Sequence, residues 1–356
     1  MARSDARRIG VLTFHRCINY GSYWQARCLI DGLRSRGHKA VLLEHDAPEV
    51  TWAEWRTALQ PLLPERSSRA DRRLYAIKIR KFLDAFEELP RSRCFPLDDP
   101  RAMEPQEMVV VGSDEVWNLS HPWYGGRTIF FGEALRADEI ISYAASFGNY
   151  DASAGLDPCW AEHLRNFSAV SVRDENSRIL VREAVGREPM LVLDPVLQFP
   201  PRAAAWREGE PYVGVYGHSL PAWFGDRVRG WARAQGYRLV SIGYRNDWAD
   251  EQRLTAGPAE FAEFMAGAAA VVTNFFHGCV FALINAKPFA AAPSAYRFNK
   301  IRDLTALVGA KAHLIREESS HTAYERALGR PLEAGIGEQI VALRQASDHF
   351  LNRVLA

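Results

Sequence analysis

The stretch at residues 271–289, VVTNFFHGCVFALINAKPF, restricts the fold more than any other part of the chain. It begins in an apolar run that predicts a buried strand and that ends at the polar corner Thr273-Asn274. The apolar segment at 279–286 predicts a helix, and residues 289–292 are short enough to form another strand. Strand, helix and strand in this order indicate a layered α/β domain with a parallel sheet.

His277 and Gly278 stand where this strand passes into the helix N-terminus. Backbone N–H groups and the positive end of the helix dipole point outward there, so the position suits a phosphate or a carboxylate. Gly278 lets another group approach the backbone closely, and Asn274 lies in the same corner. The alternative is that His277 is a packing residue at the start of the helix.

The composition is that of an ordinary folded protein with more than one domain. The chain has 356 residues, of which 47% are hydrophobic and 24% charged, and 356 residues suit two cores better than one. A formal net charge of +1 gives no reason to expect a nucleic acid partner.

Five cysteines are present without a CxxC pair, which argues against a disulfide framework or a zinc knuckle and for a reducing compartment. The N-terminal MARSDARRIG lacks the apolar core of a signal peptide, and no run reaches the ~20 apolar residues of a membrane span. We therefore expect a cytoplasmic protein, with peripheral contact to the inner face of the membrane left open. No cluster of His, Cys and Asp has metal-ligand spacing, so we expect no metal and no cofactor.

The chain starts with a strand–turn–helix–strand unit. Residues 8–14 and 40–44 predict strands, and the apolar spacing at 23–36 predicts the helix between them. Ligands of doubly wound sheets bind at the carboxyl ends of the strands, so the turn residues Asn19, Tyr20, Gly21 and Ser22 are candidate binding residues. Their alternative role is to shape the turn.

A second candidate loop, GSDEVWN, follows the apolar strand predicted at 108–111. A loop in this place is typical of an active site and supplies Ser113, Asp114, Glu115 and Asn118. Ser113 or Asp114 would alternatively cap the next helix.

Arg173 also stands at the carboxyl end of a predicted strand, residues 169–172. It either binds substrate or pairs with Asp174 or Glu175. A basic amphipathic helix predicted at 71–89 is either a solvated face or a surface for an acidic partner or anionic lipid.

The order of the elements predicts two α/β halves. We place an N-terminal domain at 1–197, a proline-containing linker at 198–210 and a second α/β domain at 211–334. The last amphipathic helix, 335–356, is expected to pack back on the first domain.

Four of these pieces together resemble the polysaccharide pyruvyl transferases. They are the Asn-Tyr-Gly turn at 19–21, the GSDEVWN loop, the SVRDE segment at 171–175 and the TNFFHG corner with Lys-Pro-Phe at 287–289. The matches run in family order from about residue 10 to about residue 310. The chain departs from the family at Glu115, where Gln is common, and at Phe275 and Cys279, where small hydroxyl residues are common.

The resemblance implies a fold similar to two-domain GT-B glycosyltransferases, with two Rossmann-like domains facing a cleft. It implies transfer of pyruvate from phosphoenolpyruvate to a sugar of a polysaccharide, for example an exopolysaccharide, or of a lipid-linked precursor. By that likeness Arg173, His277 and Lys300 surround the donor, with Arg297 or Lys287 as alternatives to Lys300.

The chemistry supports these residue types. Phosphoenolpyruvate carries a carboxylate and a phosphate, so its site needs converging cations and N–H donors. Ketal formation needs general acid–base groups; we assign His277 as phosphate ligand or acid and Asp114 as acceptor-orienting group or base, with Glu115 as substitute. Sugars stack on exposed aromatic rings, for which Trp123 and Tyr124 are better candidates than Trp117, expected in the core.

Two alternative functions remain at this stage. One is a glycosyltransferase that uses a nucleotide sugar on the same architecture, because fold alone does not separate the two reactions. The other is a non-catalytic glycan-binding relative that kept the cleft.

Overall fold

The computed structural model describes residues 6–151, 153, 155–206 and 209–356. Its described residues form two compact units. Unit 1 holds the described residues of Met1–Glu54 together with Phe86–Pro200 and Val341–Ala356, and unit 2 holds Trp55–Ala85 and Pro201–Ile340. The predicted linker at 198–210 includes residues 207 and 208, which lie outside the described part of the chain.

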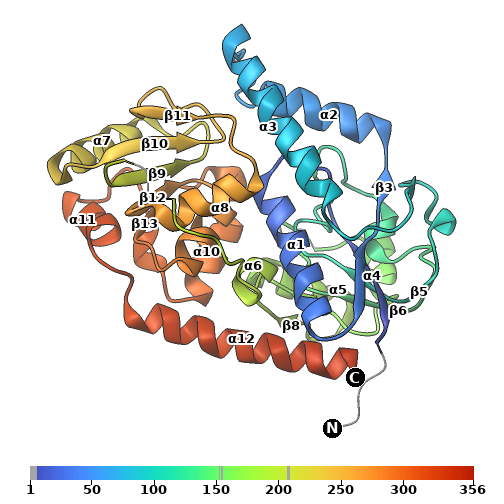
Figure 1. Ribbon diagram of the computed structural model, residues 1–356. Coiled ribbons are helices and arrows are strands. Elements are labelled where there is room, and N and C mark those ends of the chain that lie inside the picture. The colour runs from blue at the N-terminus through green and yellow to red at the C-terminus, as the bar shows by residue number, and fades with distance from the viewer. Residues whose placement is uncertain (1–5, 152, 154, 207–208) are drawn as a thin grey trace. The chain divides into compact units, whose positions relative to one another are not determined.

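Unit 1 is built on a parallel four-stranded sheet in the order β2-β1-β5-β6 (Figure 1). The pair β7-β8 continues it through isolated bridges such as Ile141↔Ala169. A two-residue pair, β3-β4, lies outside this sheet. The strands are β1 Arg8–Leu12, β2 Lys39–Leu42, β3 His45–Asp46, β4 Phe95–Pro96, β5 Gln106–Val111, β6 Ala137–Ser142, β7 Ser171–Val172 and β8 Met190–Leu191.

Helices cover the sheet of unit 1 and bury a core that includes the strand residues Leu12, Val109 and Val111. The helices that lie wholly in unit 1 are α1 Tyr20–Ser35, α4 Pro158–Leu164, α5 Glu175–Val185 and α6 Pro195–Gln198, with 3-10 turns at Pro100–Ala102 and Thr128–Phe131. Three helices have residues in both units: α2 Pro48–Leu59, α3 Arg69–Glu87 and α12 Ala334–Leu355.

Unit 2 has a parallel five-stranded sheet in the order β11-β10-β9-β12-β13, visible in yellow to orange in Figure 1. Successive residues of the central strand β9 point to opposite faces of this sheet, and helices cover both faces. Val213 and Val215 belong to the core formed with α7 and α11, whereas Gly214 faces Phe264 of α8. The strands are β9 Tyr212–Tyr216, β10 Arg238–Ile242, β11 Glu251–Arg253, β12 Ala270–Thr273 and β13 Phe289–Ala291. The helices are α7 Ala222–Gln235, α8 Pro258–Gly267, α9 Phe276–Ile284, α10 Phe298–Leu307 and α11 His321–Gly329, with 3-10 turns at Ala295–Arg297 and Lys311–His313.

The predicted fold class, α/β with parallel sheets, is confirmed. Local boundaries differ from the prediction where a side chain caps a helix. The first helix begins at Tyr20 rather than at residue 23, because the Asn19 side chain accepts hydrogen bonds from Gly21 N and Ser22 N and starts the helix a turn earlier.

The division into units differs from the predicted domain boundaries at α3. Residues 55–85 lie in unit 2, although the prediction placed them within a continuous domain at 1–197. Side-chain contacts explain the difference: Asp71 pairs with Arg245, and Tyr75 and Lys78 hydrogen bond to the segment after β10. At the other end of the chain, α12 returns to unit 1, where Ser347 Oγ accepts a hydrogen bond of 2.9 Å from Leu193 N.

Candidate active site

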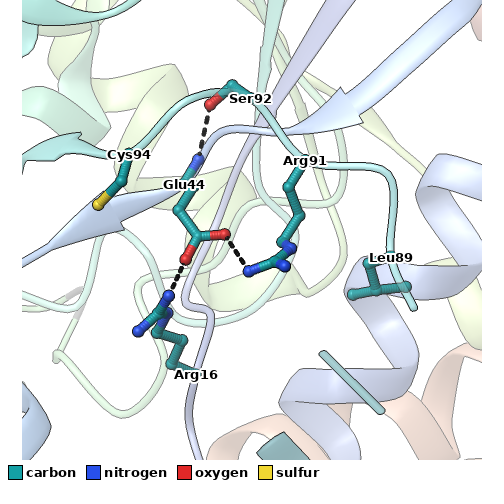
Figure 2. Close-up of a pocket in the computed structure, with 6 residues that line it drawn as sticks. All are labelled: Arg16, Glu44, Leu89, Arg91, Ser92 and Cys94. Atoms are coloured by element: carbon teal, nitrogen blue, oxygen red, sulfur yellow. Dashed lines mark hydrogen bonds and ion pairs between the residues drawn. The ribbon is translucent and has the colours of Figure 1, made fainter. Parts of the chain in front are cut away.

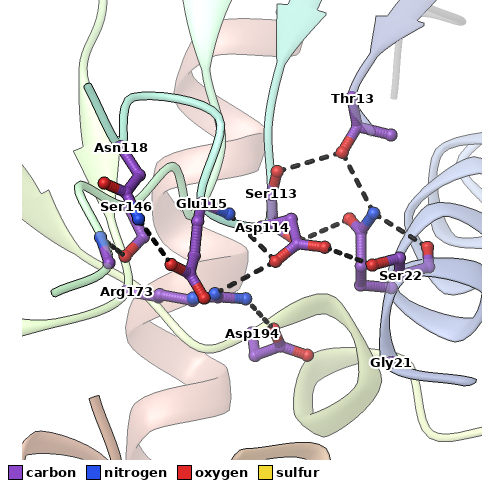
Figure 3. A network of polar contacts seen from close by, with 12 residues as sticks. Thr13, Gly21, Ser22, Ser113, Asp114, Glu115, Asn118, Ser146, Arg173 and Asp194 are labelled. Carbon is purple, nitrogen blue, oxygen red and sulfur yellow. Dashed lines mark hydrogen bonds and ion pairs between the residues drawn. The ribbon is translucent and has the colours of Figure 1, made fainter. Parts of the chain in front are cut away.

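In unit 1 a polar network occupies the carboxyl ends of β1 and β5, with Asp114 at its centre (Figure 3). Ser22 Oγ donates a hydrogen bond of 2.7 Å to Asp114 Oδ2, and Arg173 Nη2 lies 3.5 Å from Asp114 Oδ1. Asp114 has a left-handed backbone with φ of +70°, a conformation that few non-glycine residues adopt. The backbone therefore turns this carboxylate toward Ser22 and Arg173, at the edge where parallel sheets bind ligands.

Arg173 is buried within this network, which the sequence did not indicate. Its side chain is 2% exposed, and Nη1 donates a hydrogen bond of 2.9 Å to Asp194 Oδ2. Burial acts to lower the pKa of Arg173, but the carboxylates of Asp194 and Asp114 outweigh it and raise that pKa. Its ion-pair partners are thus Asp194 and Asp114, and the predicted alternatives Asp174 and Glu175 serve elsewhere: Asp174 caps α5 through Ser177 N.

Glu115 and Asn118 form the next part of the network. Asn118 Nδ2 donates to Glu115 Oε2 at 2.9 Å and to Asn149 Oδ1 at 3.0 Å. Gly148 makes room for them, because a Cβ at this position would lie 2.1 Å from Glu115 Oε2. Glu115 is therefore held by Asn118 of its own loop, beside the loop that contains Gly148 and Asn149.

Other residues predicted for this site have structural contacts. Ser113 is fully buried and donates to Gln25 Oε1 at 2.6 Å, and Thr13 Oγ1 donates to its carbonyl at 3.0 Å. Tyr20 is 1% exposed, Asn19 caps α1, and Gly21 lies in its first turn. Among the residues at the start of α1, the structure assigns the contact with Asp114 to Ser22.

The aromatic residues after the loop differ in exposure. Trp117 is completely buried and donates from Nε1 to Phe130 O, in agreement with the expected core role. Tyr124 was expected to be exposed, but it is 4% exposed because its ring stacks on Phe14 at 4.3 Å. Trp123 is half-buried against the same core and keeps part of its ring accessible.

Sequence reasoning missed Glu54, which comes from α2 and has no motif around it. Its carboxyl group is buried, interacts with the Cys17 side chain and lies 3.3 Å from Ile18 N. Burial, with a smaller contribution from nearby Asp114, raises the pKa of Glu54 to about 7. This carboxyl group is therefore suited to exchange a proton near neutral pH.

A separate pocket of about 380 Å³ opens beside the end of β2 (Figure 2). Glu44 is buried at its centre and pairs with both Arg16 and Arg91, the latter at 2.8 Å. Arg91 also pairs with Glu87. Since the guanidinium groups are already neutralised by carboxylates, this pocket offers little net positive charge to an anion.

In unit 2 the corner between β12 and α9 has the predicted geometry. The helix begins at Phe276, so His277 is its second residue, and the N-cap Phe275 supplies no side-chain hydrogen bond to the helix end. Gly278 is required for packing, since a Cβ there would lie 2.1 Å from Thr273 Oγ1. Asn274 Nδ2 donates to His218 O at 2.8 Å and so ties the loop after β9 to this corner.

His218 and Arg297 lie on the ring of Phe275. The Arg297 guanidinium is centred 4.6 Å from the Phe275 ring, and its Nη2 donates to His218 Nε2 at 3.2 Å. The His218 ring lies 5.3 Å from the same Phe275 ring. Burial, then the charges of Arg297 and Lys78, lower the pKa of His218 to about 4. The electrostatic environment at this edge is thus positive.

Lys78 brings a third basic group to this edge from α3. It is 1% exposed, donates to Gly243 O at 2.9 Å, and its Nζ lies 4.6 Å from the Tyr244 ring. The Tyr244 ring in turn lies 5.2 Å from His218 and 5.3 Å from Phe275. Burial lowers the pKa of Lys78 to about 7. Neither Lys78 nor His218 belongs to a sequence motif, and only the fold joins them to the His277 corner.

Arg297, Lys300 and Lys287, the alternatives for a further cation at the donor, differ in their distance from the His277 corner. Arg297 contacts Phe275 directly, and Lys300 follows one turn later in α10, with Nζ 5.7 Å from the Tyr296 ring. Lys287 follows the last turn of α9 and precedes β13, so it lies at the opposite edge of the parallel sheet from His277. The geometry favours Arg297 or Lys300 over Lys287.

The described residues contain no group of three or more His, Cys, Asp or Glu side chains able to hold a metal ion. The predicted site residues thus form two groups. Asp114, Glu115, Asn118, Ser113 and Arg173 belong to the network of unit 1. The residues in unit 2 are His277, Asn274, Gly278 and Lys300.

Several solved structures share the fold of this chain. MnaA of S. aureus, solved with UDP, matches with a TM-score of 0.55 and 11% identity over 98% of this chain and 96% of its own. A Listeria monocytogenes protein described as a UDP-N-acetylglucosamine 2-epimerase gives 0.53 and 10%, over 98% and 96%. The glycosyltransferase SnogD from Streptomyces nogalater gives 0.48 and 14%, over 99% and 100%. At these identities the likeness concerns the fold alone, and the two matches with TM-scores above 0.5 agree with an α/β fold with parallel sheets.

The family follows from the sequence. The family model for polysaccharide pyruvyl transferase matches residues 19–293, which include both groups of site residues except Lys300. The chain therefore belongs to the polysaccharide pyruvyl transferase family. No curated protein matches the chain.

Proposed function

We propose that this protein transfers pyruvate from phosphoenolpyruvate to a sugar of a polysaccharide or of a glycan precursor. The two sugar hydroxyls add to C2 of the enolpyruvyl group, C3 gains a proton and becomes a methyl group, and phosphate leaves. One hydroxyl proton balances C3 and the other leaves with phosphate. Family membership supports this reaction, and the two groups of site residues supply the acid–base and anion-binding chemistry that it needs.

The basic edge of unit 2 is the observation that carries the proposal for the donor. Arg297 and His218 lie beside the ring of Phe275, which directly precedes the N-terminus of α9, and Lys78 lies beside the neighbouring Tyr244 ring. Guanidinium, ammonium and backbone N–H groups are the donors that bind phosphates and carboxylates. Phosphoenolpyruvate fits because it presents both anions within a few ångström.

His277 completes this donor site as phosphate ligand or proton donor. It is the second residue of α9, where helix N–H groups have no partner within the helix. We assign Lys300 with Arg297 to the same site. No cofactor enters the proposed reaction.

The network of unit 1 is assigned to the acceptor. Asp114 accepts a hydrogen bond from Ser22 and lies beside Arg173, and these two contacts orient its carboxylate as a base for a sugar hydroxyl. Glu115, held by Asn118, is the substitute. Arg173 acts on Asp114 as a positioning residue, because its guanidinium is buried between Asp114 and Asp194.

Phosphate release from phosphoenolpyruvate, measured over a panel of sugar acceptors, tests the proposal. We expect release that depends on one class of acceptor and that falls by at least about 100-fold in Asp114→Asn and His277→Ala. Wild-type turnover in both variants would remove the assignment. Lys287→Ala, at the opposite sheet edge, is the matched control and should retain activity.

A glycosyltransferase reaction with a nucleotide sugar is the second candidate, because a protein of this fold has been solved with UDP. Thermal shift separates the two. Stabilisation by phosphoenolpyruvate supports pyruvyl transfer, and stabilisation by UDP or GDP supports the alternative. Stabilisation by a glycan alone, with no turnover of either donor, would indicate a non-catalytic binding protein.

A further inference from the structure

Exposed apolar side chains are concentrated on one segment of the chain. Of the six large hydrophobic residues that are exposed within the described residues, four lie between α2 and the middle of α3. Trp52 is 70% exposed and Trp55 36%, and their spacing places them on the same side of α2. Leu63, in the turn after α2, and Ile77, on α3, are 48% and 47% exposed.

One face of α3 is buried, and the other is exposed and rich in arginine. Tyr75, Lys78 and Phe82 on one face are buried, and Lys78 hydrogen bonds to Gly243 of unit 2. Between residues 69 and 80 the opposite face is exposed and carries four arginines and one large apolar residue, Arg69, Arg72, Arg73, Ile77 and Arg80, with the small residues Ala70 and Ala76; the exposed carboxylate Asp84 follows one turn later. The basic side chains predicted for this helix therefore fall into two groups. Lys78 and Lys81 make contacts within unit 2, with Gly243 O and Glu260, whereas the arginines are exposed at the surface.

The exposed charge on this segment is almost entirely positive. From Trp52 to Arg80 the exposed charged residues are Glu65 and six arginines, namely Arg56, Arg66, Arg69, Arg72, Arg73 and Arg80. None of the six has an ion-pair partner among the residues that the structure describes. By contrast, Arg178 and Arg245, also at the surface, are each paired with two carboxylates.

We propose that this surface, formed by α2, the turn at 60–68 and the outer face of α3, docks the protein on a bilayer that contains anionic lipid. Arginines that lack carboxylate partners match anionic headgroups, and exposed Trp, Leu and Ile beside them match the boundary between headgroups and acyl chains. Along the sequence Leu63 and Ile77 each stand between arginines, so the segment has no continuous apolar run of the kind that forms the centre of a stable protein interface. In Figure 1 both helices and their connecting turn are visible in blue.

The contact is peripheral. None of the helices in the described part of the chain is long and apolar enough to cross a membrane. Docking would bring the enzyme to a lipid-linked acceptor, but the surface is defined by its own residues and stands independently of the proposed reaction.

Co-sedimentation of the full chain with vesicles tests the proposal. We expect binding to vesicles of phosphatidylcholine mixed with phosphatidylglycerol, weaker binding as salt is raised, and little binding to phosphatidylcholine alone. Combined Arg69→Gln, Arg72→Gln and Arg73→Gln should weaken binding about 100-fold, since each basic residue near an anionic surface contributes about fivefold. The same loss of charge at exposed Arg101, Arg233 and Arg330 is the matched control and should change binding little.

The apolar anchors are tested separately. Trp52→Ala with Trp55→Ala should weaken vesicle binding about tenfold and remove the quenching of tryptophan fluorescence by brominated lipid. No binding of the wild type to the mixed vesicles would overturn the proposal. If the triple arginine variant of α3 and its control lose vesicle binding equally, the proposal is also overturned. The same holds if the α3 variant abolishes self-association or binding to an acidic protein but still binds vesicles.

Discussion

The carboxyl edges of the two sheets carry opposite charges. In unit 1, Asp114, Asp194 and Glu115 surround one arginine, Arg173, and Glu54 lies near Asp114. In unit 2, Arg297 and His218 lie beside the Phe275 ring at the start of α9, and Lys78 lies beside the adjacent Tyr244 ring. Both units use the same topological position, where parallel strands end and loops begin.

The pKa values of the groups show what the difference means. Burial raises the pKa of Glu54 and lowers that of Lys78, each to about 7, so both edges hold a group that takes up or releases a proton near neutral pH. An acidic edge suits the removal of protons from hydroxyls, and a basic edge suits a dianionic donor. The difference in charge is the basis on which we propose acceptor chemistry for unit 1 and donor chemistry for unit 2.

The largest expected effect is at the centre of the acidic edge. Arg173→Ala leaves Asp194 and Asp114 buried without their cation, so we expect the free energy of unfolding to fall by about 3–5 kcal/mol. Urea denaturation measures it. Arg178→Ala is the control: Arg178 also pairs with two carboxylates, Glu175 and Glu188, but at the surface, where the loss should stay below about 1 kcal/mol. Equal losses would show that Arg173 is not the structural centre of the network.

The sequence predicted more of the backbone than of the charges. The strands predicted at 8–14 and 108–111 are found as β1 Arg8–Leu12 and β5 Gln106–Val111, because their apolar runs are continuous. His277 was found because it lies in a motif. Lys78 and Glu54 were not, since each is brought to its edge by a helix distant in sequence and is distinguished only by burial.

The partners of a predicted residue were equally hard to infer. Arg173 was predicted either to bind substrate or to pair with Asp174 or Glu175. Its ion pairs are instead with Asp114 and with Asp194, which comes from the start of α6, while Asp174 caps α5. Tyr124 was expected at the surface because it lies in a polar loop, yet Phe14 covers it. Such contacts depend on tertiary packing, which a local pattern does not record.

Glu54 tests the acidic edge through pH. Its carboxyl group binds a proton more tightly in the fold than in the unfolded chain, so the stability of the wild type relative to Glu54→Gln should fall as pH rises from about 4.5 to about 7. The total change is up to about 3 kcal/mol, at about 1.4 kcal/mol per pH unit. Denaturation curves at both ends of this range measure it, and Glu183→Gln, an exposed carboxylate, should show almost no such slope. A flat difference for Glu54 would remove it as a proton-exchanging group.

Lys78 tests the basic edge. Lys78→Met should raise the KM for phosphoenolpyruvate about tenfold, since a lost charge-assisted contact costs about 1.4 kcal/mol or more, and should reduce the thermal stabilisation by this donor. The control is Lys81→Met on the same helix, where the ammonium pairs with Glu260 at 2.6 Å. If Lys78→Met lowers the Tm of the free protein and leaves KM unchanged, its role is to attach α3 to unit 2 and the donor assignment is wrong.

The smallest effect distinguishes Glu115 from Asp114 within the acidic edge. Gly148 and Gly186 both have left-handed backbones, with φ of +61° and +67°, so alanine costs each about 1 kcal/mol. Around Gly186 there is open space, whereas a Cβ on Gly148 would lie 2.1 Å from Glu115 Oε2 and 2.8 Å from Asn118 Nδ2. Gly148→Ala should therefore lose about 1 kcal/mol more than Gly186→Ala, because the Glu115–Asn118 hydrogen bond breaks. If phosphate release falls with it, Glu115 takes part in acceptor chemistry; if release is unchanged, Asp114 acts without it.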